Sequence, residues 1–234
     1  MAKSSLEILA YEETSLGPIC LRRREPASLQ GVVVTEVTLN HEFLMSSLYT
    51  DSEQALSAMA IQMHGGNQLR VMVAGLGLGY SAFAALESSQ VAHVEVVELL
   101  PQVIGWLNDG LVPLSEHLTG NSRLLVTQAD AYAKLANAPD EKYDLILIDV
   151  DHSPDDRLGA GDSLAFYSTE GLASAKKHLR PGGVLGVWSY AESSPFADAL
   201  RMSFKTVRVE PVTHHNELID EEHTDWLFFA SDAI

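Results

Sequence analysis

The stretch from Val71 to Tyr80 constrains the fold of this chain more than any other part of the sequence. A short, largely β-branched apolar run is followed by three alternate glycines, Gly75, Gly77 and Gly79, and then by a segment with helix-forming character. This pattern indicates a buried parallel strand that turns into a helix, where glycines let a ligand approach the first backbone N–H groups. A second strand ends in Glu98 about 20 residues further on, as expected for a carboxylate that accepts ribose hydroxyls. The sequence therefore predicts a nucleotide site.

Strand-like and helix-like segments alternate through the rest of the chain. Strands are expected near 71–74, 94–97, 124–127, 145–148 and 183–188, and helices near 80–87, 101–108, 131–136, 169–179 and 195–204. Two closing strands near 206–210 and 226–230 predict an antiparallel hairpin at the sheet edge. The order predicts an α/β fold with a doubly wound, mostly parallel seven-stranded sheet that binds ligands at the carboxyl ends of its strands.

The first 50 residues have a different pattern. Short β-prone segments at 8–10, 18–21 and 32–37 are separated by turn-forming residues and predict a small antiparallel β segment. Asp51 stands where it could cap a helix that runs to about Met63. We therefore expect a small N-terminal β segment at 1–50 and a nucleotide-binding catalytic domain at 51–234.

The charge balance narrows the choice of partners. The chain of 234 residues carries 15 basic and 32 acidic residues, a formal net charge of −17. Nucleic acid and anionic membrane surfaces would be repelled, so a cationic or neutral small substrate is favoured. A single cysteine, Cys20, a polar start and apolar runs too short to cross a bilayer predict a cytoplasmic protein without a transmembrane segment.

Polar or flexible residues follow each of the first four strands of the predicted sheet. They are Gly75, Glu98, Asp130 and Asp149. Because the carboxyl ends of parallel strands meet at one edge of a sheet, these four residues are expected to line one crevice. Taken singly, these acids have alternatives: Asp130 could cap the helix that follows, and Glu98 could be a solvated strand end.

Several segments together resemble the class I AdoMet-dependent transferases and, more narrowly, the spermidine synthase (polyamine aminopropyltransferase) family. They are Val71 to Gly79, Val96 to Glu98, Gln128 to Ala131, Tyr143 to Asp149 and Leu179 to Gly183. The resemblance implies a donor that is S-adenosylmethionine or its decarboxylated form, a small amine as acceptor, and a possible homodimer through the N-terminal β segment. It also implies that the three glycines bed the methionine-derived part of the donor and that Glu98 binds the ribose. By the same resemblance, Asp130 binds the adenine amino group and Asp149 is the catalytic acid.

The loop after Asp149 offers two further catalytic candidates, Asp151 and His152. In extended backbone Asp149 and Asp151 share a side, and a histidine titrates near neutrality and can relay a proton. Three positions depart from the family pattern. The acid usually found between the last two glycines is Leu78, an aspartate of the catalytic loop is replaced by His152, and a tyrosine is replaced by Asp51.

These departures keep other functions open. The absence of a carboxylate at Leu78 favours a methyltransferase that uses ordinary AdoMet, and a nucleotide-binding protein without turnover has the same fold. An NAD-dependent dehydrogenase would require glycine where Tyr80 stands. The spacing of His214, His215 and His223 fits no standard zinc pattern, so no metal is predicted.

Overall fold

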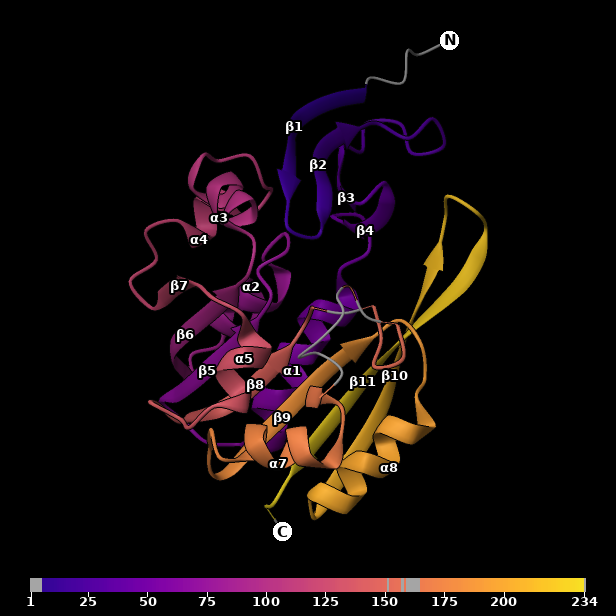
Figure 1. Cartoon of the computed structure of the whole chain (residues 1–234). Helices are drawn as coiled ribbons and strands as arrows, with labels where there is room; N and C mark the ends of the chain where they lie inside the picture. Colours follow the sequence, from indigo (N-terminus) through magenta and orange to yellow (C-terminus); the bar gives the residue numbers. More distant parts are fainter. Residues whose placement is uncertain (1–5, 151, 157, 159–164, 234) are drawn as a thin grey trace.

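The computed structural model describes residues 6–150, 152–156, 158 and 165–233. Figure 1 shows a small sheet above a larger sheet that is flanked by helices. The small sheet is antiparallel, in the order β1-β2-β3-β4. Its strands are β1 (Leu6–Thr14), β2 (Gly17–Arg24), β3 (Val34–Leu39) and β4 (Glu42–Ser46). The predicted N-terminal β segment is confirmed, with β4 as a strand that the sequence pattern did not indicate.

The larger sheet has seven strands in the order β10-β11-β9-β8-β5-β6-β7. The strands are β5 (Leu69–Ala74), β6 (Val91–Glu98), β7 (Leu124–Gln128), β8 (Tyr143–Ile148), β9 (Leu179–Ser189), β10 (Thr206–Asn216) and β11 (Glu221–Ser231). Strands β5 to β9 pair in parallel, whereas β11 pairs antiparallel with both β9 and β10. The prediction of a doubly wound, mostly parallel sheet with an antiparallel hairpin at one edge is confirmed.

Helices cover both faces of the larger sheet (Figure 1). One face carries α1 (Asp51–His64), α2 (Tyr80–Glu87), α3 (Pro101–Asn108) and the short α4 (Ser115–Leu118); the other carries α5 (Ala131–Ala136), α7 (Thr169–Lys176) and α8 (Ser194–Ser203). The predicted cap of α1 is wrong: Asp51 is already helical, and Thr50 at the N-cap position makes no side-chain cap bond. None of the helices in the described part of the chain has the length and apolar character needed to span a bilayer.

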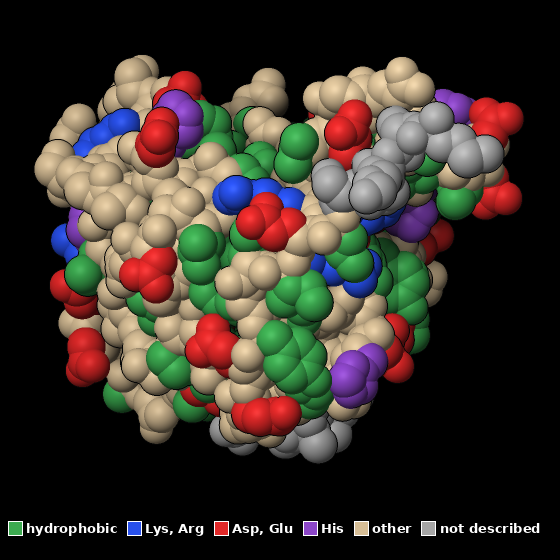
Figure 2. Space-filling model, turned by 90° about the horizontal axis from the view of Figure 1, so that it is seen from above, with side chains coloured by type: hydrophobic (Ala, Val, Ile, Leu, Met, Phe, Trp, Pro, Cys, Tyr) green, Lys and Arg blue, Asp and Glu red, His purple; other side chains and the backbone are tan. Residues whose placement is uncertain are grey.

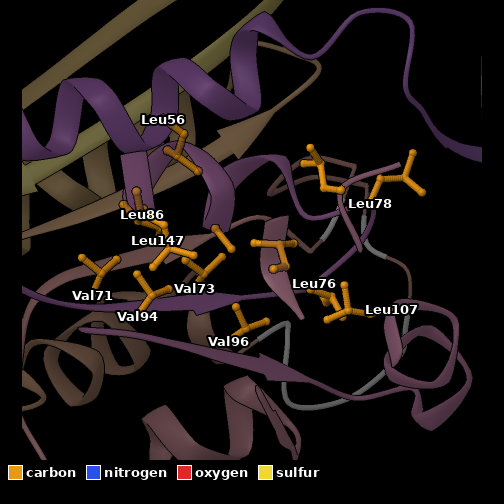
Figure 3. Packing of buried hydrophobic residues seen from close by; sticks show 14 of the residues in the cluster. Leu56, Val71, Val73, Leu76, Leu78, Leu86, Val94, Val96, Leu107 and Leu147 are labelled. Carbon is orange, nitrogen blue, oxygen red and sulfur yellow. The ribbon is translucent and has the colours of Figure 1, made fainter. Parts of the chain in front are cut away.

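The alternation of side chains along the central strands builds a core on each face. On β5, Val71 and Val73 pack on the face of α1, and Met72 and Ala74 pack on the opposite face. Figure 3 shows the first of these cores, where Leu56 of α1 and Leu86 of α2 lie over strand residues such as Val73 and Leu147. Both faces are apolar because a parallel sheet is covered on both sides.

The small sheet packs on the same core as α1, since its buried residues Ile19, Leu21, Val37 and Leu39 belong to that cluster. It also docks on α3 and the segment that follows. The indole Nε1–H of Trp106 donates to Glu12 at 3.0 Å, and Arg23 donates to the carbonyl oxygen of Leu111 at 2.8 Å. The division of the chain into units at residue 50 stays a prediction.

The β10–β11 hairpin is longer than predicted. The two strands pair from Thr206 and Ser231 out to Asn216 and Glu221, but β11 pairs with β9 only over its last six residues, Trp226 to Ser231. The outer half therefore projects beyond the sheet, toward the small sheet (Figure 1). There His214 stacks on Tyr49 with ring centroids 4.5 Å apart, and Glu217 N–H donates to the Tyr49 hydroxyl at 2.7 Å.

Candidate active site

The glycine loop after β5 lies against the loop after β8. Gly75 has a φ of +89°, and a Cβ atom at this position would collide with the carbonyl oxygen of Asp149. Two backbone hydrogen bonds keep the two loops in place. Gly75 N–H donates to the carbonyl oxygen of Val97 at 2.9 Å, and Asp149 N–H donates to the carbonyl oxygen of Ala74 at 3.0 Å. A side chain at residue 75 would therefore separate the two loops, since backbone atoms cannot move aside as a flexible side chain can.

Glu98, at the end of β6, is held by backbone donors. Its side chain is buried, and its carboxylate accepts hydrogen bonds from Leu76 N–H at 2.8 Å and Leu100 N–H at 2.7 Å. Burial raises the pKa of Glu98, and the backbone N–H groups oppose that rise because they stabilise the ionised form. The carboxylate is thereby fixed between the glycine loop and the start of α3, where its remaining lone pairs can accept hydroxyl groups.

Asp130 caps helix α5. Its Oδ1 accepts from Tyr132 N–H at 2.8 Å and Ala133 N–H at 3.1 Å. The structural alternative that the sequence left open for Asp130 is thus correct. It does not exclude a second role, because both cap bonds go to the same oxygen and Asp130 also lines a cavity.

The cavity that Asp130 lines has a volume of about 230 Å³ and is the larger of two adjoining cavities. It brings the predicted strand-end residues together. Gly75, Gly77, Glu98, Asp130 and Asp149 all line it. Its opposite wall is apolar and comes from the small sheet and its turns, namely Leu16, Ile19, Leu39, Leu44 and Met45. The combination of an apolar enclosure and a few convergent polar groups is typical of a small-molecule site.

A smaller cavity of about 70 Å³ adjoins the larger one. Its lining includes Glu53, Leu78, Gly79, Tyr80, His152 and Trp188. Five residues line both cavities: Leu44, Met45, Gly77, Asp149 and Val150. The two spaces therefore have Asp149 as a common part of their walls.

Asp149 is partly buried, and its Oδ2 accepts a hydrogen bond from the Ser81 hydroxyl at 2.6 Å. Burial raises the pKa of Asp149 to about 6, and the Ser81 hydrogen bond opposes the rise without cancelling it. An acid in this range can both accept and release a proton near neutral pH.

Glu53, in the first turn of α1, is a site residue that the sequence analysis did not select as one. Burial and the nearby charge of Asp149 raise its pKa to about 8. The available signal was its place three and seven residues before Leu56 and Ala60, which are buried on the apolar face of the same helix. An acid on an apolar helix face is unusual enough to mark a functional candidate.

The remaining residues singled out in the sequence differ in whether the structure places them at the site. His152 lines the smaller cavity, and its Nδ1 lies 3.8 Å from the Asp156 carboxylate. Leu78 also lines this cavity but is buried with only 4% of its surface exposed. Asp151, the third predicted acid of the loop, lies outside the described residues.

The histidines of the hairpin are engaged in ion pairs or ring contacts. His215 lies 3.2 Å from both Asp220 and Glu222, and His223 lies 3.2 Å from Asp225. Within the described ranges, no three His, Cys, Asp or Glu side chains are grouped as metal ligands would be.

Comparison with known proteins relates the chain to one group of enzymes, although no family model matches it. A curated relative, polyamine aminopropyltransferase 2 of Streptomyces coelicolor, is 31% identical over 140 residues, which cover 59% of this chain and 24% of that protein. The polyamine aminopropyltransferase of Prochlorococcus marinus is 30% identical over 141 residues, which cover 60% of this chain and 46% of that protein. The chain thus spans less than half the length of these two relatives.

The fold is shared with solved structures. A spermidine synthase in complex with the transition-state analogue AdoDATO has a TM-score of 0.75 at 17% identity and covers 97% of this chain and 74% of its own. The spermidine synthase from Thermotoga maritima has a TM-score of 0.72 at 17% identity, with 97% and 73% covered. At this identity the match establishes the fold.

Proposed function

We propose that this spermidine synthase-like chain is a transferase that moves an alkyl group from an AdoMet-type sulfonium donor to a small amine. One observation carries the proposal: two cavities, one lined by Glu98 and Asp130 and the other by Glu53, share Asp149 in their walls. Such a junction is what an in-line displacement requires, because donor carbon and acceptor nitrogen must be held in contact and aligned.

The larger cavity fits the donor. Its glycine loop has no side chain at Gly75 and Gly77 to obstruct a ligand, and the Glu98 carboxylate is fixed where ribose hydroxyls could donate to it. Asp130 would accept from the adenine amino group. When bound, the donor supplies a carbon activated by the positively charged sulfur, and a neutral thioether leaves.

The smaller cavity fits a cationic amine. Glu53 and Asp149 both face it, and Trp188 forms part of its wall. An alkylammonium ion is attracted there, but only its unprotonated form can attack the donor carbon. Asp149 accepts the hydrogen bond that orients the amine and is the group that takes its proton. His152 is a further candidate for this proton transfer, and Asp151 remains a prediction from the sequence.

Leu78 bears on which donor molecule binds. In the resembled synthases an acid at this position would hold the ammonium of decarboxylated AdoMet, whereas here the position is a buried leucine. This favours a second candidate function, methyl transfer from ordinary AdoMet at the same site. The mass added to the acceptor, aminopropyl or methyl, distinguishes the two.

The test measures binding first and turnover second. Calorimetric titration with AdoMet, decarboxylated AdoMet and methylthioadenosine is expected to show binding of at least one, and mass spectrometry of mixed diamines and polyamines is expected to show alkylated product. Asp149→Asn should abolish product and retain nucleotide affinity, with Asp140→Asn as an exposed control. Absence of binding by all three nucleotides rejects the proposal, and binding without product indicates a non-catalytic nucleotide-binding protein.

A further inference from the structure

A chain of hydrogen bonds leads from the smaller cavity to the molecular surface through residues far apart in the sequence. Glu53 Oε2 lies 3.1 Å from the Ser52 hydroxyl, which lies 2.7 Å from Asp225 Oδ2 on β11. The other oxygen of Asp225 lies 3.2 Å from His223 Nε2. The side chain of Asp225 is 7% exposed and that of His223 is 50% exposed, so the chain begins in the cavity, crosses a buried carboxylate and ends in solvent.

The geometry around Ser52 defines the direction of these bonds. A hydroxyl has one proton and two lone pairs, and one lone pair of Ser52 is taken by the indole Nε1–H of Trp188 at 2.9 Å. The short contact to Asp225 identifies that carboxylate as the acceptor of the hydroxyl proton. The Ser52 hydroxyl is also placed to donate to Glu53 Oε2, so its single proton can go to only one of the two carboxylates at a time. When Glu53 is protonated, it can instead donate to the second lone pair of Ser52. Every donor and acceptor position of Ser52 is filled when Glu53 carries a proton.

The charges around Glu53 agree with this arrangement. Burial and the charges of Asp149 from the β8 loop and Asp225 from β11 favour a proton on Glu53, whereas hydrogen bonds from the Glu53 backbone and from Ser52 oppose it. Tyr80 of α2 and His152 line the same cavity. At the outer end, His214 of β10 lies with its ring 5.3 Å from that of His223.

We propose that Ser52, Asp225 and His223 form a proton path that connects Glu53 in the smaller cavity with solvent. The role of this path rests on the proposed function, because an acceptor that enters as an ammonium ion must lose one proton for each transfer. Asp149 takes the amine proton. The Glu53 proton moves to the Ser52 oxygen as the Ser52 proton moves to Asp225, Asp225 passes a proton to His223 Nε2, and His223 releases its other ring proton to water. The ionised Glu53 then takes up the proton that Asp149 received from the amine. The new C–N bond takes the nitrogen lone pair, and the broken C–S bond leaves its electron pair on sulfur.

The experiment observes the path without turnover. Infrared difference spectroscopy at neutral pH is expected to show the carbonyl stretch of a protonated carboxyl group that Glu53→Gln removes. After a rapid jump from mildly acidic to mildly alkaline buffer, this band should decay. The decay should slow by about 100-fold in Ser52→Ala and in His223→Gln, the low end of what one proton-transferring group contributes. Free imidazole should restore the rate of His223→Gln.

The controls separate the path from folding and from the proposed function. His215→Gln lies on the same hairpin, pairs with surface acids rather than with Asp225, and should leave the decay unchanged. His223→Gln alters a half-exposed side chain, so it remains informative if Ser52→Ala does not fold. Absence of the carboxyl band, or equal decay rates in wild type and variants, overturns the path. A slowed decay in a protein that binds none of the three nucleotides retains the path and rejects the transferase.

Discussion

At the scale of single residues, the contact between Gly75 and Asp149 sets the distance between the two loops that carry the site. Gly75→Ala should destabilise the fold by about 2 to 4 kcal/mol, which combines left-handed backbone strain with overpacking. Urea unfolding measures this loss. Gly182→Ala is the matched control, since Gly182 has a φ of +80° but no atom within 4 Å of the added Cβ. It should cost only the strain, about 1 to 2 kcal/mol; equal losses in both variants would show that the loop contact is unimportant.

The raised pKa of Glu53 makes stability depend on pH. With a folded-state pKa of about 8 against an ordinary value of 4.5, Glu53 contributes stability that is complete below pH 4.5 and is lost as the pH rises toward 8. Glu53→Gln should therefore flatten the decline of melting temperature over this interval and melt several degrees above wild type at alkaline pH. Glu116→Gln, at an exposed acid of α4, should follow the wild-type curve. An unchanged slope in Glu53→Gln would contradict the expectation.

The sequence predicted the residues that follow strands and missed those that reach the site from elsewhere. Glu98, Asp130 and Asp149 line one cavity, as expected from the rule that parallel strand ends converge. Glu53 and Asp225 come from α1 and β11, and nothing in their local sequence places them beside Asp149. Their positions depend on how the helix and the hairpin pack, which no motif encodes.

At the scale of elements, Asp130 joins a helix terminus to the cavity. Asparagine is as good an N-cap as aspartate, so Asp130→Asn should keep the unfolding free energy within about 0.5 kcal/mol, whereas Asp130→Ala should lose about 1 kcal/mol. If the carboxylate also binds the adenine amino group, Asp130→Asn should weaken nucleotide binding in calorimetry despite the intact cap. Equal affinities for wild type and Asp130→Asn would leave capping as the sole role.

Two strands show why the extent of elements was only partly predictable. The sequence before β4 contains Asn40 and His41, which both have positive φ, at 50° and 69°, and join β3 to β4 in a two-residue turn. Asparagine tolerates this conformation, so its position was the available signal for a hairpin. In the β10–β11 hairpin, the outer pairs extend past the last β11 residue that pairs with β9, and His214 stacks on Tyr49 there.

At the scale of the whole molecule, the excess of acids acts on stability. Acidic side chains are spread over the face shown in Figure 2, and basic ones are few there, in keeping with the net charge of −17. Their mutual repulsion is screened by salt, so the melting temperature should rise by a few degrees from low to moderate ionic strength. Sodium and potassium chloride should act equally if screening is the cause. A melting temperature that falls with both salts would show that attractive ion pairs dominate instead.

The larger cavity has one wall from each sheet, and this has a consequence for the mechanics of the molecule. The apolar side chains of Leu39 and Met45 face the strand ends that carry Glu98 and Asp149. A ligand in that cavity contacts both sheets at once and therefore restrains their relative movement while it is bound. Occupancy would thus be reported by the resistance of the connection between the sheets, near Tyr49, to a protease, well away from any reacting atom.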